Sequence, residues 1–359
     1  MEERYRPSGP VAGSGGIATI PSNSSESGSG GALNSTAGVR EVGGALGSAG
    51  QGVVSSVPSG PDPLRTPPPL CFLDQPCGSK ADYVSIWGSS PLDIWVVATT
   101  PSTGKSALLH WDGLVWQIDL MPGAYTLNAV WGSAKDDVWV VGRSATVRHF
   151  DGSVWSSRLP PVGAPIDFTA VSGTSASDVW VVGWGMTIRH FDGAAWSSGI
   201  TATYDRFLSV WASADEVWVL GDETINHFDR TSWTTAARPN DNDLTSVWGR
   251  LNHQAWVASK AGILQNWNLT EWQANAVDGQ TAAVNFRRLW GSFDNDVWAM
   301  GEDGAVAHWD GQRWAVGPHL TDSNLNAAWG YPGSTWFVGD NGAFLKFDGT
   351  DWQARPDTN

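Results

Sequence analysis

The chain has 359 residues and a formal net charge of −15, and it contains 24 Trp and 42 Gly but only two Cys. Such an acidic chain repels phosphate backbones and shows no basic stripe, so nucleic acid is excluded as an expected partner. No run approaches about 18 apolar residues, which argues against a transmembrane helix. Gly for turns and large aromatic residues for strands favour an all-β protein.

Residues 1–69 are dominated by Gly, Ser, Ala, Pro and Thr and show no periodic apolar pattern. A segment of this composition cannot bury enough apolar surface to offset its conformational entropy, so we expect a disordered tether. The first ten residues, MEERYRPSGP, lack the apolar core of a signal peptide. The sequence therefore indicates no route of export.

Residues 70–81 form a lead-in that holds both cysteines, Cys71 and Cys77. Two cysteines are too few for a structural zinc site, which takes four ligands. We expect a local disulfide if the protein is exported, and two free thiols if it is cytosolic. No metal or other cofactor is expected.

Residues 82–356 contain seven copies of one repeat. The clearest copy, residues 127–155, reads LNAVWGSAKDDVWVVGRSATVRHFDGSVW. Its four short runs rich in Val, Trp and Phe, separated by Asp, Gly and Ser, predict four short strands. The copies, each an expected blade, lie near residues 82–120, 125–160, 166–200, 205–237, 242–276, 284–318 and 323–356.

Three columns of Trp follow the repeat, and we interpret them as packing between blades rather than as sugar-stacking platforms. The first column contains Trp87, Trp131, Trp211, Trp248, Trp290 and Trp329, with Ser172 once in its place. The second contains Trp95, Trp139, Trp180, Trp218, Trp256, Trp298 and Trp336. The third contains Trp116, Trp155, Trp196, Trp233, Trp272, Trp314 and Trp352.

The length of the repeat decides the architecture. Members of the third column are about 39 residues apart, close to the roughly 40–45 residues of a four-stranded propeller blade. Five Asp-Gly pairs suit tight hairpins that need positive φ. The sequence therefore predicts a seven-bladed β-propeller of four-stranded blades, preceded by a disordered N-terminal segment.

The D-G-x-x-W segment is similar to the Asp-box (BNR) of sialidase-like propellers and to tectonin-type repeats, although a true Asp-box has one residue between Asp and Gly. The V-W-G-S…D-V-W-V-V-G…H-x-D-G-x-x-W unit of residues 82–356 resembles Trp-rich propeller repeats of predicted exported proteins in myxobacteria. The resemblance implies a propeller with an extracellular, cell-surface or periplasmic location. If the D-G turn joins the third and fourth strands, as in the Asp-box, it also implies contiguous blades and a ring that closes by packing of blade seven on blade one, without an exchanged strand. These families include enzymes, lectins and assembly factors, so no single function follows.

A histidine recurs near the end of the third run in five copies: His110, His149, His190, His227 and His308. Radial symmetry spreads equivalent positions apart, whereas metal ligands must converge within a few ångströms. We therefore expect each His to bond a neighbouring turn in its own blade.

The chain shows no assembled catalytic site. A glycosidase pair needs two carboxylates roughly 5–10 Å apart across a cleft, but most Asp residues here occupy repeat turns. Phosphate loops, Ser-His-Asp signatures and the His-Glu-x-x-His motif are absent. The sequence thus leans against an enzyme, and no catalytic residue is named.

One column varies in charge within the otherwise regular repeat, at the turn that follows V-V-G. Propeller turns of this kind share a face with the blade connections, the usual ligand site. The column contributes the candidate ligand-binding residues Arg143, Trp184, Asp222, Lys260, Glu302 and Asp340. The connections add Tyr204, Arg206 and Arg288, with Asp205 and Arg287 beside them.

The sequence thus favours a non-enzymatic, lectin-like or protein-binding module that recognises a glycan or protein through this loop face. The alternatives are a lyase or glycosidase at the central channel and a structural scaffold. An enzyme needs converging ionisable groups, and a sugar binder needs exposed aromatic rings in several blades. The oligomeric state is left open.

Overall fold

A computed structural model describes residues 81–101, 103–119, 126–160, 166–198, 205–236, 238–239, 243–250, 254–281 and 284–354. All of these residues belong to one compact unit, Val57–Asn359. The expected disordered tether and the cysteines Cys71 and Cys77 lie outside the described residues. In the part of the chain that is described, no helix is long and apolar enough to cross a membrane.

The described chain forms seven four-stranded antiparallel blades. Blade 1 contains β1 (Asp82–Ser90), β2 (Asp93–Thr99), β3 (Ser106–Trp111) and β4 (Trp116–Asp119). Blade 2 contains β5 (Leu127–Ala134), β6 (Asp137–Gly142), β7 (Val147–Phe150) and β8 (Trp155–Ser157). Blade 3 contains β9 (Phe168–Ser175), β10 (Asp178–Gly183), β11 (Thr187–Phe191) and β12 (Trp196–Ser198). Blade 4 contains β13 (Phe207–Ala212), β14 (Val217–Gly221), β15 (Ile225–Phe228) and β16 (Trp233–Ala236).

Blade 5 contains β17 (Leu244–Arg250), β18 (Gln254–Ser259), β19 (Leu264–Trp267) and β20 (Trp272–Asn275). Blade 6 contains β22 (Phe286–Phe293), β23 (Asp296–Gly301), β24 (Val306–Trp309) and β25 (Trp314–Val316), and β21 (Val277–Asp278) joins its outer edge in parallel. Blade 7 contains β26 (Leu325–Tyr331), β27 (Ser334–Gly339), β28 (Phe344–Phe347) and β29 (Trp352–Ala354). Single turns of 3-10 helix, η1 (Glu302–Gly304) and η2 (Asp340–Gly342), follow β23 and β27.

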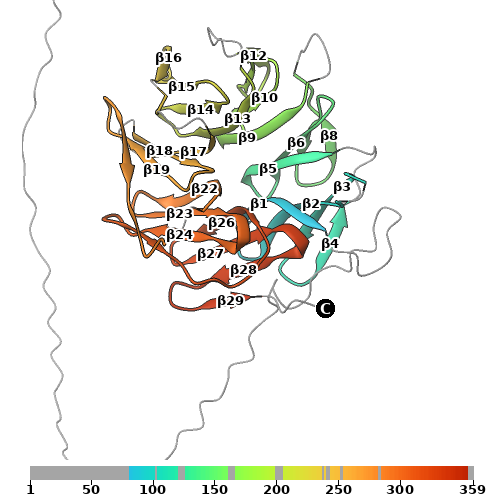
Figure 1. The fold of residues 1–359 in the computed structure, drawn as a ribbon. Helices are drawn as coiled ribbons and strands as arrows, with labels where there is room; N and C mark the ends of the chain where they lie inside the picture. The colour runs from blue at the N-terminus through green and yellow to red at the C-terminus, as the bar shows by residue number, and fades with distance from the viewer. Residues whose placement is uncertain are drawn as a thin grey trace, which may run out of the picture. The chain divides into compact units, whose positions relative to one another are not determined.

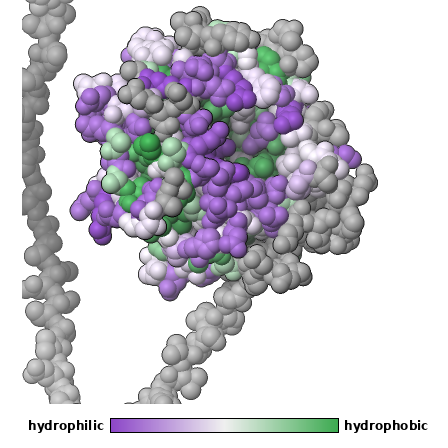
Figure 2. Space-filling view, in the orientation of Figure 1, coloured by the Kyte–Doolittle hydropathy of each residue, from purple (hydrophilic) through white to green (hydrophobic). Residues whose placement is uncertain are grey.

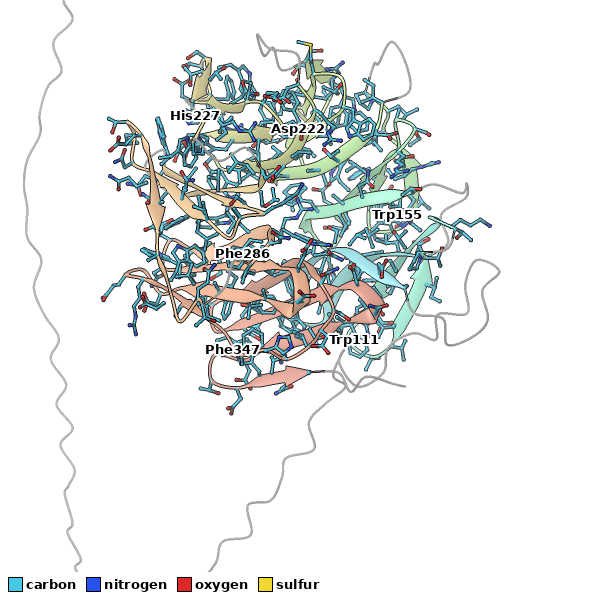
Figure 3. All side chains as sticks on the ribbon, viewed as in Figure 1. Trp111, Trp155, Asp222, His227, Phe286 and Phe347 are labelled. Atoms are coloured by element: carbon cyan, nitrogen blue, oxygen red, sulfur yellow. The ribbon has the colours of Figure 1, made fainter. Side chains whose placement is uncertain are left out.

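The strands of each blade follow one another along the chain from the centre of the ring to its rim (Figure 1). Figure 3 accordingly labels Phe286 near the centre and Trp155 and Phe347 near the rim. The predicted seven-bladed propeller of contiguous four-stranded blades is confirmed. The additional strand β21 was not predicted.

Apolar clusters hold the ring together, one at each interface between blades. The second strands supply more of these side chains than any other strand of the blade, and every residue of β6 is buried. Burying one large apolar side chain contributes roughly 1.5–3 kcal/mol, so each interface is strongly favourable. The blade 7 to blade 1 interface has a cluster of the same kind, and among the described strands none is exchanged between these two blades.

The second and third Trp columns meet between blades. The second-column Trp95 is 2% exposed and meets the third-column Trp155 of the next blade edge-to-face, at 5.7 Å between ring centroids and 84°. The same contact recurs at every interface up to Trp298 with Trp352. At the closing interface Trp116 instead meets Phe344, at 6.0 Å. The predicted inter-blade packing of these columns is confirmed.

The first Trp column packs on the glycines of the V-W-G motif. A β-carbon at Gly132 would lie 2.6 Å from Cη2 of Trp87, in the preceding blade, and equally close to the carbonyl oxygen of Asp137. Gly88, Gly173, Gly249 and Gly291 also face the Trp of the preceding blade. Glycine is therefore required here for close approach rather than for a positive φ.

The interface between blades 3 and 4 departs from this arrangement. Ser172 replaces the Trp of blade 3, and Ala212 replaces the Gly of blade 4. The Ser172 hydroxyl accepts a hydrogen bond from the N–H of Ala212, at 3.2 Å. Arg230 reaches across the same interface and pairs with both carboxylate oxygens of Asp178, at 2.9 Å each. This interface thus has an ion pair and lacks the Trp-on-Gly contact found at five of the others.

The outer hairpins depend on the predicted turn residues. Asp151 accepts hydrogen bonds from the N–H groups of Ser153 and Val154, and Gly152 has φ of 90°. In blade 5, the most divergent copy, Asn268 makes the same two bonds and Leu269 takes the glycine position with φ of 82°. The amide oxygen of Asn268 therefore replaces the Asp carboxylate. The positive φ of Leu269, at the glycine position, is a source of backbone strain.

Candidate functional site

The repeat histidines pair with carboxylates in their own blades. Nε2 of His149 lies 2.7 Å from Oδ1 of Asp137, and the other four pairs are equally short. Burial acts to raise the pKa of Asp137, but hydrogen bonds from His149, Ser133 and Trp139 outweigh it and hold the pKa below its ordinary value. The expectation that each His bonds within its blade is confirmed.

These clusters do not have the geometry of a catalytic triad. The Ser133 hydroxyl donates to Asp137, at 2.5 Å, so it does not hand its proton to His149. A nucleophilic serine must be within hydrogen-bond reach of its base. The same arrangement recurs in blades 1 and 6, which is typical of a structural device. Among the described residues, no group of three or more His, Cys, Asp or Glu side chains could hold a metal ion.

A cavity of about 670 Å³ occupies the face that carries the turns after the second strands and the connections between blades; we call it the loop-face cavity. Its basic lining residues are Arg143, Arg206, Arg238, Lys260, Arg287 and Arg288. Its acidic lining residues are Asp82, Asp167, Asp222, Asp243 and Asp340. Six basic against five acidic groups make this cavity far more basic than the chain as a whole, whose net charge is −15. Figure 2 shows that hydrophilic residues also predominate around the centre of the face drawn there.

The structure brings most of the candidate ligand-binding residues together. Seven of them line the loop-face cavity: Arg143, Trp184, Arg206, Asp222, Lys260, Arg288 and Asp340. Glu302 bonds Arg287, which lines the cavity, and Tyr204 lies outside the described residues. That these residues bind a ligand stays a prediction.

The backbone of the variable column is fixed although its side chains differ. The N–H of Arg143 donates to the carbonyl oxygen of Thr126, at 2.8 Å, and that of Trp184 to Asp167, at 3.0 Å. The four other candidate residues of this column make the equivalent bond in their own blades. The fold therefore presents six dissimilar side chains from a rigid frame, as a recognition surface requires.

Trp184 forms the aromatic part of the cavity wall, and 46% of its surface is exposed. The guanidinium carbon of Arg206 lies 5.4 Å from the centre of its ring, a cation–π distance. Arg206 also pairs with both oxygens of Asp222, at 2.7 and 3.1 Å. These three side chains, from the turns and connection of blades 3 and 4, form one pre-organised group. The label of Asp222 in Figure 3 marks its position.

A second group of polar residues lies at the interface between blades 6 and 7. Arg287 contacts Glu302 at 3.3 Å, Asp340 at 3.7 Å and the amide oxygen of Asn326 at 3.0 Å. Hydrogen bonds from Asn285 and Arg287 hold the pKa of Glu302 below its usual range. Burial raises the pKa of Asp82 despite a hydrogen bond from the backbone of Asn341.

Two details of the sequence interpretation were wrong or incomplete. Arg287 and Arg288 were placed in a connection, but they lie within β22, an inner strand that lines the channel. Asn326 was overlooked. It occupies the position equivalent to Arg287 in β26 and donates to the carbonyl oxygen of Tyr83 in blade 1, at 3.0 Å. The recurrence of Asn or Thr at this position in Asn128, Thr169 and Thr245 was the available signal.

A second cavity, of about 520 Å³, lies farther along the inner strands; we call it the Trp-ring cavity. All six Trp of the first column line it, with Ser172 in the gap. Val84 and Arg288 line both cavities.

Several solved structures are similar to this chain. YCF48 from Cyanidioschyzon merolae matches with 19% identity and a TM-score of 0.60, over 76% of this chain and 97% of that one. A structure of YCF48 bound to D1 peptide matches with 16% identity and a TM-score of 0.63, over 76% and 95%. Virginiamycin B lyase from Staphylococcus aureus matches with 10% identity and a TM-score of 0.63, over 75% and 94%.

No protein-family model and no curated protein matches the chain. At these identities the structural likeness shows the fold alone. The similar propellers include a peptide-binding protein and a lyase, so the fold serves both interaction and catalysis.

Proposed function

We propose that this propeller is a non-enzymatic interaction module that binds a protein partner, as an extended peptide segment, in the loop-face cavity. The observation that carries the proposal is the cavity itself, where Trp184, Arg206 and Asp222 project from a hydrogen-bonded frame among basic side chains. Such a surface suits a peptide that supplies apolar and acidic side chains.

The arrangement of aromatic residues favours a peptide over a glycan. A sugar binder of repeated design would expose an aromatic ring in several blades. Of the described residues that line the loop-face cavity, Trp184 is the one aromatic side chain. A single ring beside an Arg–Asp pair supports one anchor pocket rather than seven equivalent sugar sites.

The carboxylates favour binding over catalysis. Asp222 is paired with Arg206, Asp340 accepts from Asn324 and Asn326, and Asp167 accepts from the backbone of Ser144. A general acid or base must be able to reach a proton of the substrate. Carboxylates whose oxygens already accept these hydrogen bonds are better suited to hold the cavity wall in place than to transfer a proton.

A peptide-display selection on the full chain tests this function. We expect enriched peptides with a Kd of roughly micromolar size and at least about a tenfold loss of affinity for the Trp184→Ala/Arg206→Ala variant. Val154→Ala is the matched control, because Val154 is an exposed side chain in a β7–β8 hairpin, away from the cavity lining. Equal binding by all three proteins would refute the loop-face site. A glycan array run with the same variants would favour a lectin if it alone gave Trp184-dependent binding.

The proposal includes display outside the cytoplasm, at the cell surface or in the periplasm, as the resemblance implies. Fractionation of the producing cells with an antibody against the propeller tests this part separately. Recovery of the protein only in the cytosolic fraction would refute display outside the cytoplasm. It would not bear on the proposed peptide-binding site.

A further inference from the structure

One layer of the central channel is built almost entirely from small side chains. The residue two positions before the first-column residue of each inner strand lines the Trp-ring cavity, and we call this set the small-residue layer. Its members are Ser85, Ala129, Ala170, Ser209, Ser246, Arg288 and Ala327. Six of the seven positions hold Ala or Ser, and blade 6 alone holds a long cation.

Arg288 lies where the two cavities meet, because its side chain lines both. No hydrogen bond or ion pair joins its guanidinium to any residue that the structure describes. Its neighbour Arg287 already holds Glu302 and Asp340. Desolvation lowers the pKa of Arg288, with no carboxylate opposing it. Arg288 is half-buried, and a partly desolvated cation without a counter-charge is stabilised by an anion that joins it.

The small-residue layer also contains three serine hydroxyl groups. The Ser85 hydroxyl oxygen accepts from the N–H of Val130 at 3.1 Å, and that of Ser246 accepts from Leu289 at 3.1 Å. Ser209 accepts from Val247 in the same way, at 3.4 Å. None of the three hydroxyl protons is donated to a described residue. Ser209 and Ser246 are only 4% and 0% exposed, so the half-buried Ser85 is the one of these three hydroxyl groups that the channel can reach.

We propose that Arg288, within the small-residue layer, forms an anion site in the central channel that receives one carboxylate group. The planar fork of a guanidinium matches the two oxygens of a carboxylate, and the small neighbours leave room for a slender group. The carboxylate comes either from a small free acid or from the end of a chain that enters through the loop-face cavity. This site does not depend on the proposed peptide surface, because a small anion alone reveals it.

Thermal unfolding of the full chain, followed by Trp fluorescence at low ionic strength with increasing sodium acetate, tests the site. A ligand that binds the folded state raises the unfolding temperature in proportion to its occupancy. We expect a saturable rise of several degrees for the wild type and none for Arg288→Ala or Arg288→Met. Arg288→Ala introduces the residue that blades 2, 3 and 7 carry at this position, so we expect the variant to fold. Without acetate, its unfolding temperature should be no lower than that of the wild type. Arg313→Ala controls for general salt effects, since Arg313 pairs with Asp278 outside both cavities.

Two further probes identify the source of the carboxylate. Triglycine and its C-terminal amide differ only in that group. Stabilisation by triglycine at lower concentration than acetate, with no effect of the amide, assigns the site to a chain terminus. Equal or better stabilisation by acetate assigns it to a small acid.

Three results would overturn the proposal. The first is an equal acetate response in the wild type and Arg288→Ala. The second is earlier unfolding of Arg288→Ala without acetate, together with no response of the wild type, which would make Arg288 a packing residue. The third is stabilisation by sulfate but not by acetate, which would exclude a carboxylate.

Discussion

The indole of Trp329, in blade 7, lies against Gly88, in blade 1, so closely that a β-carbon at Gly88 would stand 2.8 Å from its Cη2 atom. This contact between the last and first blades repeats the contact of Trp87 with Gly132 inside the ring. The same local device therefore holds consecutive blades and the two ends of the propeller together.

Gly88→Ala is expected to destabilise the propeller by about 2 kcal/mol, because the new methyl group meets both Trp329 and the carbonyl oxygen of Asp93. Ala212→Gly, at the equivalent position of blade 4, should cost only about 0.5–1 kcal/mol, through backbone entropy. Denaturant unfolding of both variants measures the difference. Equal losses would mean that the Trp-on-Gly contact does not determine the glycine.

Ser172→Trp is expected to destabilise by about 1–3 kcal/mol, because the restored indole faces the β-carbon of Ala212. Addition of Ala212→Gly should recover part of this loss, with a favourable coupling of about 1 kcal/mol in a double-mutant cycle. Simple additivity of the two changes would contradict the pairing of these positions.

Leu269→Gly is expected to stabilise the protein by about 0.5–1 kcal/mol. Leu269 has φ of 82° in a hairpin where five of the other blades have glycine and blade 4 has Arg230, and its side chain is exposed. Removing left-handed strain gains about 1–2 kcal/mol, and the freer unfolded chain takes part of that back. The reverse change, Gly311→Leu, is the matched control and should destabilise by a similar amount. A loss of stability in Leu269→Gly would show that the leucine makes a contact worth more than the strain.

Acid is expected to weaken the propeller through the carboxylates of its repeats. Burial acts to raise the pKa of Asp178, but His190, Arg230, Thr174 and Trp180 bond it and hold the pKa far below the ordinary value of 3.8. As pH falls below roughly 4, such groups take up protons in the unfolded chain first, so the free energy of unfolding falls with pH. Asp82, whose pKa is raised, acts in the opposite sense.

The contribution of the Arg230–Asp178 pair to this acid sensitivity can be tested with the variant Arg230→Ala. In Arg230→Ala the pKa of Asp178 rises toward its ordinary value, so the acid transition should begin at higher pH than in the wild type. Loss of the partly buried pair should also cost about 2 kcal/mol at neutral pH. Arg313→Ala, which removes a more exposed pair, should leave the transition where it is. Trp fluorescence measured against pH gives the pH at which each variant begins to unfold. The same pH for Arg230→Ala and Arg313→Ala would contradict this account.

Much of the fold was readable in the sequence because its signals are local and repeated. The Asp-Gly turns recur in five blades, and an apolar second strand with its Trp recurs in all seven, so the predictions for single blades support one another. The partner of Trp87 was harder to foresee, because the motif pairs it with Gly132 of the next blade rather than with its own. Strand β21 has only two residues and pairs in parallel with β25. No periodic pattern in the sequence predicts such a short strand.

The candidate site was foreseen only in part. The variable column was visible because Arg143, Trp184 and Lys260 interrupt a regular repeat. The small-residue layer was equally visible as Ala or Ser in six copies, but its meaning depends on which face of the inner strand looks into the channel. Alternation along the sequence does not predict which side chains point into the channel when a bulge shifts the strand register. Such a shift occurs between Phe286 and Arg288.

The succession of first-column residues also has a bearing on how such a ring can change by duplication and recombination. A blade that begins with V-W-G accepts a preceding blade that carries Trp. Blade 4, with Ala212, follows a blade whose Trp has become Ser172. A copy of blade 4 inserted after blade 5 would bring Ala212 against Trp248, whereas a copy of blade 2 would bring a glycine there. Blades of this protein are therefore not interchangeable modules, and the ancestry of the ring would be expected to show blades 3 and 4 inherited as a pair.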